Sequence, residues 1–199
     1  MPTRFVPEGY QHGVVYRDLT SAVSSAKVPT AKYPTSEDFG PTHTPQRQEL
    51  KFAVDDYVFM EPFHINHDIK PLGSKAFIHV HWSTNGTDNG YVQWECTILR
   101  ALGHNQDVAE GHFGGTPVVK TVEQQASGTA WQHMIAEVPD GEEITLTEPD
   151  EIIFVTLRRI AASTDECTAD VFGLTVGFHY EADRVGTPQR APNFYERKR

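Results

Sequence analysis

An apolar–polar alternation is the sequence feature that most constrains the fold of this chain. Within residues 75–82, Ile78 and Trp82 occupy one parity, whereas His79 and His81 occupy the other. Successive side chains of a strand point to opposite faces, so this pattern is typical of a half-buried strand. We expect the apolar side chains to face a core and the histidines to line the opposite, solvated face.

A second alternating segment occupies residues 91–99, after Asn-Gly pairs at 85–86 and 89–90. Val92 and Trp94 share its apolar parity. Asn-Gly pairs tolerate the positive backbone angles of tight hairpin turns. The sequence therefore predicts that the two segments form one antiparallel hairpin, as neighbours in a sheet with one wet face.

Strand-like segments recur at short spacing along the chain, with turn signals such as Gly-Gly and Pro-Asp-Gly between several of them. Eight are expected, at residues 50–56, 57–64, 75–82, 91–99, 116–123, 130–138, 151–160 and 169–181. In the last of them, Phe172 and Val176 share one parity and Gly177 has the other. The pattern favours an all-β fold, a jelly-roll-like antiparallel β-sandwich over residues 50–183.

The chain has 199 residues, of which 38% are hydrophobic, and this is enough for one sizeable core. Its two cysteines, Cys96 and Cys167, lack a CxxC spacing, so neither a zinc site nor a disulfide framework is indicated. A single Cys96–Cys167 bridge stays open as an alternative. The apolar stretches are of strand length, and we expect no membrane span and no secretory signal.

Residues 1–49 differ in composition from the rest of the chain, because proline and small polar residues recur there without a sustained apolar period. We expect an extended N-terminal arm with a possible short helix around residues 18–26. Apolar side chains within the arm favour packing against a neighbouring subunit over a purely solvated linker. The predicted interface residues of the arm are Phe5, Tyr16, Leu19 and Tyr33.

Charge is distributed unevenly along the chain. Residues 51–183 carry 7 basic against 21 acidic groups, whereas the tail, residues 184–199, carries five basic groups and one acidic group. An acidic body repels phosphate backbones, so nucleic acid is not an expected partner. The basic end, Arg197, Lys198 and Arg199, is either a docking element for an acidic protein surface or a solvated terminus.

Several motifs occur in an order that resembles a group of tailed-bacteriophage virion proteins. The resemblance covers residues 50–196, and Tyr16-Arg17-Asp18-Leu19 is similar to the arm that precedes the domain in that group. The motifs are HDIKPLG at residues 67–73, HVHW at 79–82, GYVQW at 90–94, SGTAWQHMIAEVP at 127–139 and GFHYEADRVGTPQRAPNFYE at 177–196.

This resemblance implies a non-enzymatic virion structural protein without a cofactor. Within the group, it implies most directly a trimeric capsid decoration (cement) protein. Such a protein is made in the bacterial cytoplasm, binds the major capsid protein and itself, and lies on the capsid surface, where it bridges capsid subunits. A component associated with the tail, fibre or baseplate, or a carbohydrate (receptor) binding β-sandwich, is the alternative function.

The histidines allow a more remote metal-binding alternative. Gly73, His79 and His81 match the opening of the cupin motif, in which two strand histidines converge on a metal inside a jelly roll. The glutamate that the motif requires next is missing. A third ligand would come from one of three other residues, Glu95, His133 or His179.

No metal site is therefore predicted on these grounds, and His79 and His81 are assigned to a subunit interface. Trp82, Trp94 and Trp131 are expected to anchor a core or an interface. A tryptophan platform for sugars would require exposed rings, whereas Trp82 and Trp94 both have the core parity.

Overall fold

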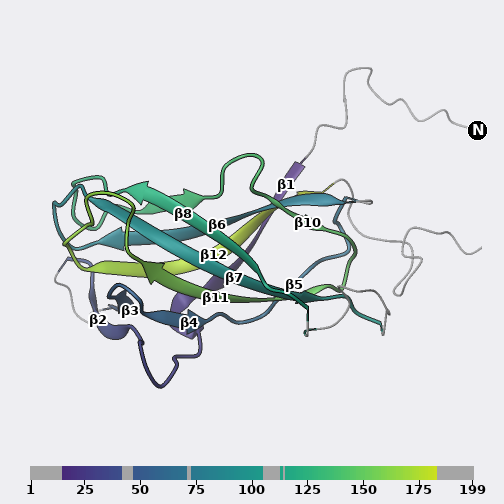
Figure 1. Cartoon of the computed structure of the whole chain (residues 1–199), viewed down its shortest axis with the longest axis horizontal. Helices are drawn as coiled ribbons and strands as arrows, with labels where there is room; N and C mark the ends of the chain where they lie inside the picture. Colours follow the sequence, from purple (N-terminus) through teal and green to yellow (C-terminus); the bar gives the residue numbers. More distant parts are fainter. Residues whose placement is uncertain (1–14, 42–46, 71–72, 105–112, 114, 183–199) are drawn as a thin grey trace, which may run out of the picture.

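The computed structural model describes residues 15–41, 47–70, 73–104, 113 and 115–182. Two antiparallel sheets pack face to face, and the long strands of both run the length of the molecule (Figure 1). The predicted all-β sandwich is thereby confirmed. The described residues contain one short 3-10 helix, η1 (Val23–Ser25), and no helix there is long and apolar enough to cross a membrane.

The first sheet, sheet A, has the strand order β10-β6-β12-β3-β2, with β1 paired to β12 and β9 paired to β6. Its strands are β1 (Val15–Ala22), β2 (Thr35–Phe39), β3 (Arg47–Phe52), β6 (Ser74–Thr84), β9 (Met134–Glu137), β10 (Ile144–Leu146) and β12 (Val171–Ala182).

The second sheet, sheet B, has the order β4-β11-β7-β8, with β5 also paired to β11. Its strands are β4 (Tyr57–Phe59), β5 (Phe63–His64), β7 (Tyr91–Ala101), β8 (Val118–Gln125) and β11 (Ile152–Ile160). All eight predicted strand segments contain strands of the two sheets, whereas β1, β2 and β10 were not expected.

The expected hairpin of β6 and β7 does not form, because β6 lies in sheet A and β7 in sheet B. Residues 85–90 cross from one sheet to the other, at a corner where Gly90 passes so close to Asp165 that a Cβ would lie 2.6 Å from its carbonyl oxygen. Trp82 and Trp94 are both fully buried. Both indoles would face the core whether the two strands shared one sheet or lay in opposite sheets. The apolar parity alone therefore did not decide which strands pair.

The core lies between the sheets and is bridged by aromatic pairs. Phe52 of sheet A meets Trp94 of sheet B with ring centroids 5.3 Å apart, and Phe63 of sheet B meets Phe178 of sheet A at 5.0 Å. Both pairs are nearly perpendicular, the edge-to-face geometry that aromatic quadrupoles favour. These contacts fix how the inner faces of the two sheets oppose each other.

The arm was predicted to end at residue 49 and the domain to begin at residue 50, whereas the structure has strands of the sandwich before this boundary. Residues 15–22 form β1, which pairs with β12 along its whole length, and β2 pairs with β3 at the sheet edge. The helix expected around residues 18–26 is wrong, because that segment is strand followed by the single turn η1. The described part of the predicted arm therefore extends sheet A of its own chain.

A β-bulge corrects the predicted parity of the last strand. The register between β12 and β6 shifts between Gly173 and Thr175, so Phe172 no longer shares a face with Val176. Phe172 instead packs against Phe39 and Trp131, with centroids 5.3 and 5.7 Å away. Bulges insert one residue and reverse the facing of those beyond it, a change that alternation does not reveal.

The two cysteines are buried and unbridged, so the alternative of a Cys96–Cys167 disulfide is corrected. Burial raises the pKa of the Cys96 thiol to about 12, with the neighbouring Glu95 carboxylate adding to the effect. Cys96 therefore acts as a small apolar side chain of β7.

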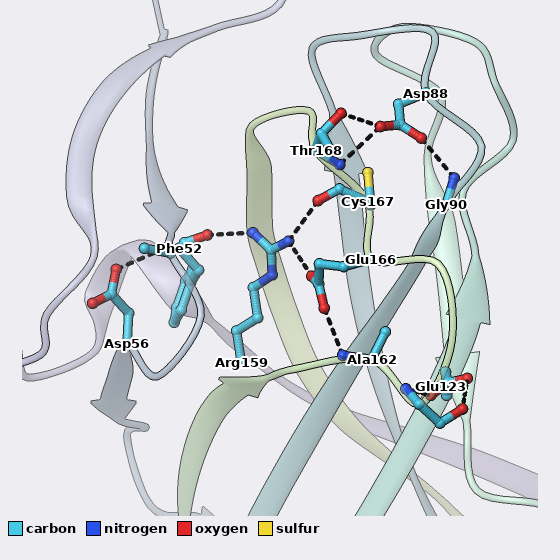
Figure 2. A network of polar contacts seen from close by, with 12 residues as sticks. Phe52, Asp56, Asp88, Gly90, Glu123, Arg159, Ala162, Glu166, Cys167 and Thr168 are labelled. Atoms are coloured by element: carbon cyan, nitrogen blue, oxygen red, sulfur yellow. Dashed lines mark hydrogen bonds and ion pairs between the residues drawn. The ribbon is translucent and has the colours of Figure 1, made fainter.

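One end of the sandwich is held by Arg159, a nearly buried residue of β11 (Figure 2). Its guanidinium donates to the carbonyl oxygens of Phe52 and Cys167 at 2.7 and 3.0 Å and to the Glu166 carboxylate at 2.6 Å. Glu166 in turn accepts a hydrogen bond from the Ala162 N–H. One cation thus ties the end of β3 to the loop that precedes β12.

Replacing Arg159 by Met should lower the free energy of unfolding by at least about 2 kcal/mol, because Glu166 and two carbonyl groups lose their donor. The neighbouring Arg158, which is 36% exposed and pairs with Asp55, provides the matched control. Arg158→Met should cost less than about 1 kcal/mol. Urea unfolding at pH 7 measures both, and equal losses for the two variants would contradict the anchoring role of Arg159.

Candidate functional site

The seven histidines that the structure describes fall into two clusters. The first is the outer-face cluster of sheet A, on the side that faces away from the core. It contains His79, His81, His133 and His179, together with the carboxylates Asp18 and Glu137. The second surrounds Asp150 and contains His64, His67 and His104.

Strand register brings the outer-face cluster together. His79 of β6 lies opposite Gly177 of β12 on one side and opposite Glu137 of β9 on the other. On the far edge of β12, β1 places Asp18 opposite His179. Directly opposed residues of neighbouring strands lie within side-chain contact distance. Four strands therefore direct their titratable groups toward one spot.

His79 is fully buried although it lies on the outer face, so the prediction of a solvated histidine face is corrected for this residue. Gly177 makes room for its ring, since a Cβ at Gly177 would lie 2.6 Å from His79 Nε2. Neither ring nitrogen has a hydrogen-bond partner within the described residues. The nearest carboxylate oxygens belong to Asp18, 3.5 Å from Nε2, and Glu137, 3.8 Å from Nδ1.

The ring of His79 is held in its neutral form. Its pKa is lowered from 6.5 to about 4, first by burial and then by the neighbouring His179 and His81, against the opposing effect of Asp18 and Glu137. His179 stacks on His79, with ring centroids 4.1 Å apart. At neutral pH the buried imidazole therefore has an available lone pair and no partner for it among the described residues.

His81 has a different environment from His79. Its Nδ1 lies 2.7 Å from Nε2 of His133, and burial together with His133 lowers its pKa. The cupin-like alternative does not describe this geometry, because the two histidines lie on the outer face of sheet A and not inside the sandwich. The assignment of His79 and His81 to a subunit interface stays a prediction, although the fully buried ring of His79 has no exposed surface of its own.

An open hollow of about 300 Å³ adjoins the outer-face cluster. We call it the outer-face pocket, and it is lined by Tyr16, Phe77, Glu137, Asp140 and His179. The ring of Tyr16, a residue that is 52% exposed, stands at 68° to the nearly buried ring of Phe77 with centroids 6.1 Å apart. Two aromatic rings and two carboxylates therefore share one hollow on the surface.

A larger hollow of about 420 Å³ lies between β10 and the strands β7 and β8. Its described lining contains no aromatic ring. The charged side chains there are paired, Lys120 with Glu142, Arg100 with Glu151, and Glu143 with Lys75 outside the hollow. Such pairing leaves fewer groups for a ligand than the outer-face pocket offers.

The second histidine cluster is centred on Asp150 at a positive backbone φ of 62°. His104 Nε2 lies 2.7 Å from one carboxylate oxygen, and the Nε2 atoms of His67 and His64 lie 3.1 and 3.2 Å from the other. Burial raises the pKa of Asp150, but hydrogen bonds from His104 and His67 and the nearby charges outweigh it and leave the pKa lowered. The cluster joins the end of β5 to the segments that follow β7 and precede β11, at one end of that strand pair.

The other predicted interface residues have separate positions. Tyr16 and Tyr33 are half exposed, and Leu19 packs against the core. The remaining ones, Phe5, Arg197, Lys198 and Arg199, lie outside the described residues.

The sequence prediction included His179 as a possible third ligand but not Asp18 or Glu137. The signal for Asp18 lay in the alternation of β1, where Tyr16, Asp18 and Thr20 share a parity opposite to Leu19. Assigning this segment as a strand would have indicated Asp18 as a candidate site residue.

No protein-family profile matches the chain, and no curated protein is similar to it. Solved structures with a similar strand arrangement include several carbohydrate-binding modules. A family 35 module from Clostridium thermocellum has a TM-score of 0.44 and 10% identity, over 80% of this chain and 97% of that one. A module CBM36 in complex with calcium and xylotriose has a TM-score of 0.44 and 12% identity, over 80% and 98%.

A β-1,3-glucan binding module CBM6 from Bacillus halodurans has a TM-score of 0.40 and 12% identity, over 85% of this chain and 96% of that one. At TM-scores below 0.5, these similarities carry no argument for the ligand of this chain.

Asp150→Asn should lower the free energy of unfolding at pH 7 by about 1–3 kcal/mol, since three histidines lose a charged acceptor. A lowered carboxyl pKa stabilises the fold above the unfolded value of about 3.9, and that contribution is lost as the pH falls through the folded pKa. The difference between wild type and variant should therefore shrink below about pH 4. Asn tolerates a positive φ, so the backbone is preserved.

Urea unfolding from pH 7 to pH 3 measures this effect, with the exposed Glu61→Gln as a control that should leave stability unchanged. A destabilisation by Asp150→Asn that stays constant down to pH 3 would show that the carboxylate charge is not its cause.

Proposed function

We propose that this protein is a non-catalytic saccharide-binding β-sandwich whose binding site is the outer-face pocket. The observation that supports it is the pairing of an exposed tyrosine ring and a second aromatic ring with two carboxylates in one open hollow. Binding pockets typically combine aromatic walls with a small number of polar groups that fix orientation. The support comes from this geometry and not from the similarity to solved modules.

The chemistry of the lining selects a neutral, polyhydroxylated ligand. The ring of Tyr16 offers an apolar face on which the C–H face of a sugar ring packs, and Phe77 forms the floor beside it. Glu137 and Asp140 accept hydrogen bonds from hydroxyl groups. The same carboxylates, on a body with an excess of acidic groups, repel phosphate and other anions.

The proposed role is binding without catalysis. A carboxyl group that acts as a general acid is typically held protonated by an apolar pocket that excludes water. Glu137 is instead engaged by the His179 ring and is 39% exposed, and Asp140 lies exposed after the end of β9. Neither carboxyl group is therefore assigned a role in bond cleavage.

Tyr16→Ala should weaken saccharide binding at least tenfold, about 1.4 kcal/mol, because the ring that packs on the sugar is removed. Tyr33, which is 50% exposed against 52% for Tyr16 and does not line the pocket, provides the matched control. A glycan array of neutral oligosaccharides identifies a ligand, and calorimetry then compares Tyr16→Ala with Tyr33→Ala. No binding on the array, or equal loss in both variants, would contradict the proposal.

A second candidate is the virion decoration function that the sequence resemblance implies. The observation in its favour is an apolar row on the outer face of sheet B. Register aligns Val119, Thr97, Thr156 and Phe59 across the four strands β8, β7, β11 and β4. Phe154 lies beside this row and packs on Phe113, and the apolar members of this surface are 39–53% exposed.

An exposed apolar sheet face of this kind is typical of a protein–protein contact. Under this function it would contact the major capsid protein or a second and third copy of the chain. Phe154→Glu should abolish self-association or occupancy on particles, as measured by sedimentation velocity and by electron microscopy of virions. The exposed Val28→Glu is a control outside that face. A wild-type chain that is monomeric and also fails to bind capsids would end this candidate.

A further inference from the structure

We propose that Asp18, His79 and His179 form a binding site for one divalent transition-metal ion of the zinc type. Among the described residues, each of the three offers one donor atom, and these atoms all lie within 4.8 Å of one another. The inference stands independently of the saccharide proposal, because it concerns donors that exist whether or not a sugar binds.

The spacing of the donors is close to that of a zinc site. Asp18 Oδ1 lies 3.5 Å from His79 Nε2, and Asp18 Oδ2 lies 3.9 Å from His179 Nε2. Tetrahedral zinc with bonds of about 2.0–2.1 Å separates its donors by about 3.3–3.4 Å. All three donor atoms lie within 4.8 Å of one another, so side-chain movement has to bring them to this shorter spacing when an ion binds.

Glu137 supplies the outer support that such sites use. Its carboxylate forms a hydrogen bond with Nδ1 of His179 and lies 3.8 Å from Nδ1 of His79. A carboxylate on Nδ1 holds the proton there and directs the Nε2 lone pair outward, as in the carboxylate–histidine–zinc arrangement. For His179, the Nε2 atom is the one that lies beside Asp18.

The burial of His79 provides an independent observation. A fully buried imidazole with two unpartnered nitrogens carries a desolvation cost that a native fold seldom retains without a compensating contact. Gly177 packs directly against this ring, since a Cβ there would lie 2.6 Å from Nε2, so no larger residue could stand beside the buried imidazole. A metal ion at Nε2 would satisfy the ring.

The donor set decides which class of ion fits. Two imidazole nitrogens and one carboxylate oxygen suit zinc and its transition-metal neighbours, whereas calcium and magnesium require oxygen ligands throughout. Three protein donors leave one tetrahedral position for water or another ligand. Asp18 and His179 are 44% and 37% exposed, so this open position is accessible from solvent.

The Asp150 cluster is a less suitable metal site, although it contains three histidines. Its donor atoms are not among the described groups whose members all lie within 4.8 Å of one another. Each imidazole there already has Asp150 as its partner. His104 is therefore a matched control, a partly exposed histidine from the second cluster.

The test is calorimetric titration of the full chain with Zn²⁺, after chelator treatment and without a polyhistidine tag or saccharide. We expect one ion per chain. Asp18→Asn and His179→Ala should each weaken binding by more than about 100-fold, and Glu137→Gln by about 10-fold, because loss of outer support typically costs 10–100-fold. His104→Ala should bind as the wild type does.

Circular dichroism and the urea midpoint establish that each variant is folded. Asp18 and His179 are partly exposed, so their variants carry the test in place of the buried His79. Absence of stoichiometric Zn²⁺ binding would overturn the proposal. Binding that survives both Asp18→Asn and His179→Ala, or that is lost in His104→Ala, would overturn it as well, because the ion would then be held elsewhere.

Discussion

The pairing of β1 with β12 is the contact on which both the edge of sheet A and the candidate site depend. Unpaired backbone donors and acceptors at a sheet edge are costly when buried and adhesive when exposed. In β12, residues 171–173 pair with β3 and residues 175–182 pair with β1, so this edge of β12 is covered along its length. The bulge lies between the two paired segments. The same pairing delivers Asp18 to the histidines of β6 and β12.

The two outer faces of the sandwich have opposite chemistry. Sheet A presents imidazoles, carboxylates and the outer-face pocket, whereas sheet B presents the apolar row that ends at Phe59, with Phe154 beside it. Inner faces are equivalent in a sandwich, because both must be apolar to form the core. Outer faces are not bound by that requirement, so the difference between them is where a function can be encoded. The saccharide and virion proposals use different faces and are mutually compatible.

Polar anchors hold the loops that connect the sheets. Arg159 and Asp150 each gather several partners from distant parts of the chain, the first through backbone carbonyls and Glu166 (Figure 2), the second through three histidines. Both lie at or just before β11, whose strand runs along the middle of sheet B. Rigid ends of this kind position the surface groups on the strands between them, which a binding site requires.

The order of residues alone specifies the all-β class, the inward side of the long strands and most of the strand positions. These depend on local alternation, in which the apolar parity around Trp82 or Trp94 must face a core. Alternation does not specify that β6 and β7 separate into different sheets, that a bulge turns Phe172 outward, or that β1 completes sheet A. Each of these depends on which strands pair, and pairing is a long-range choice that alternation leaves open. For the same reason the sequence indicated His79 and His179 as candidates but not their meeting with Asp18 and Glu137, since four strands far apart in the chain had to come into register first.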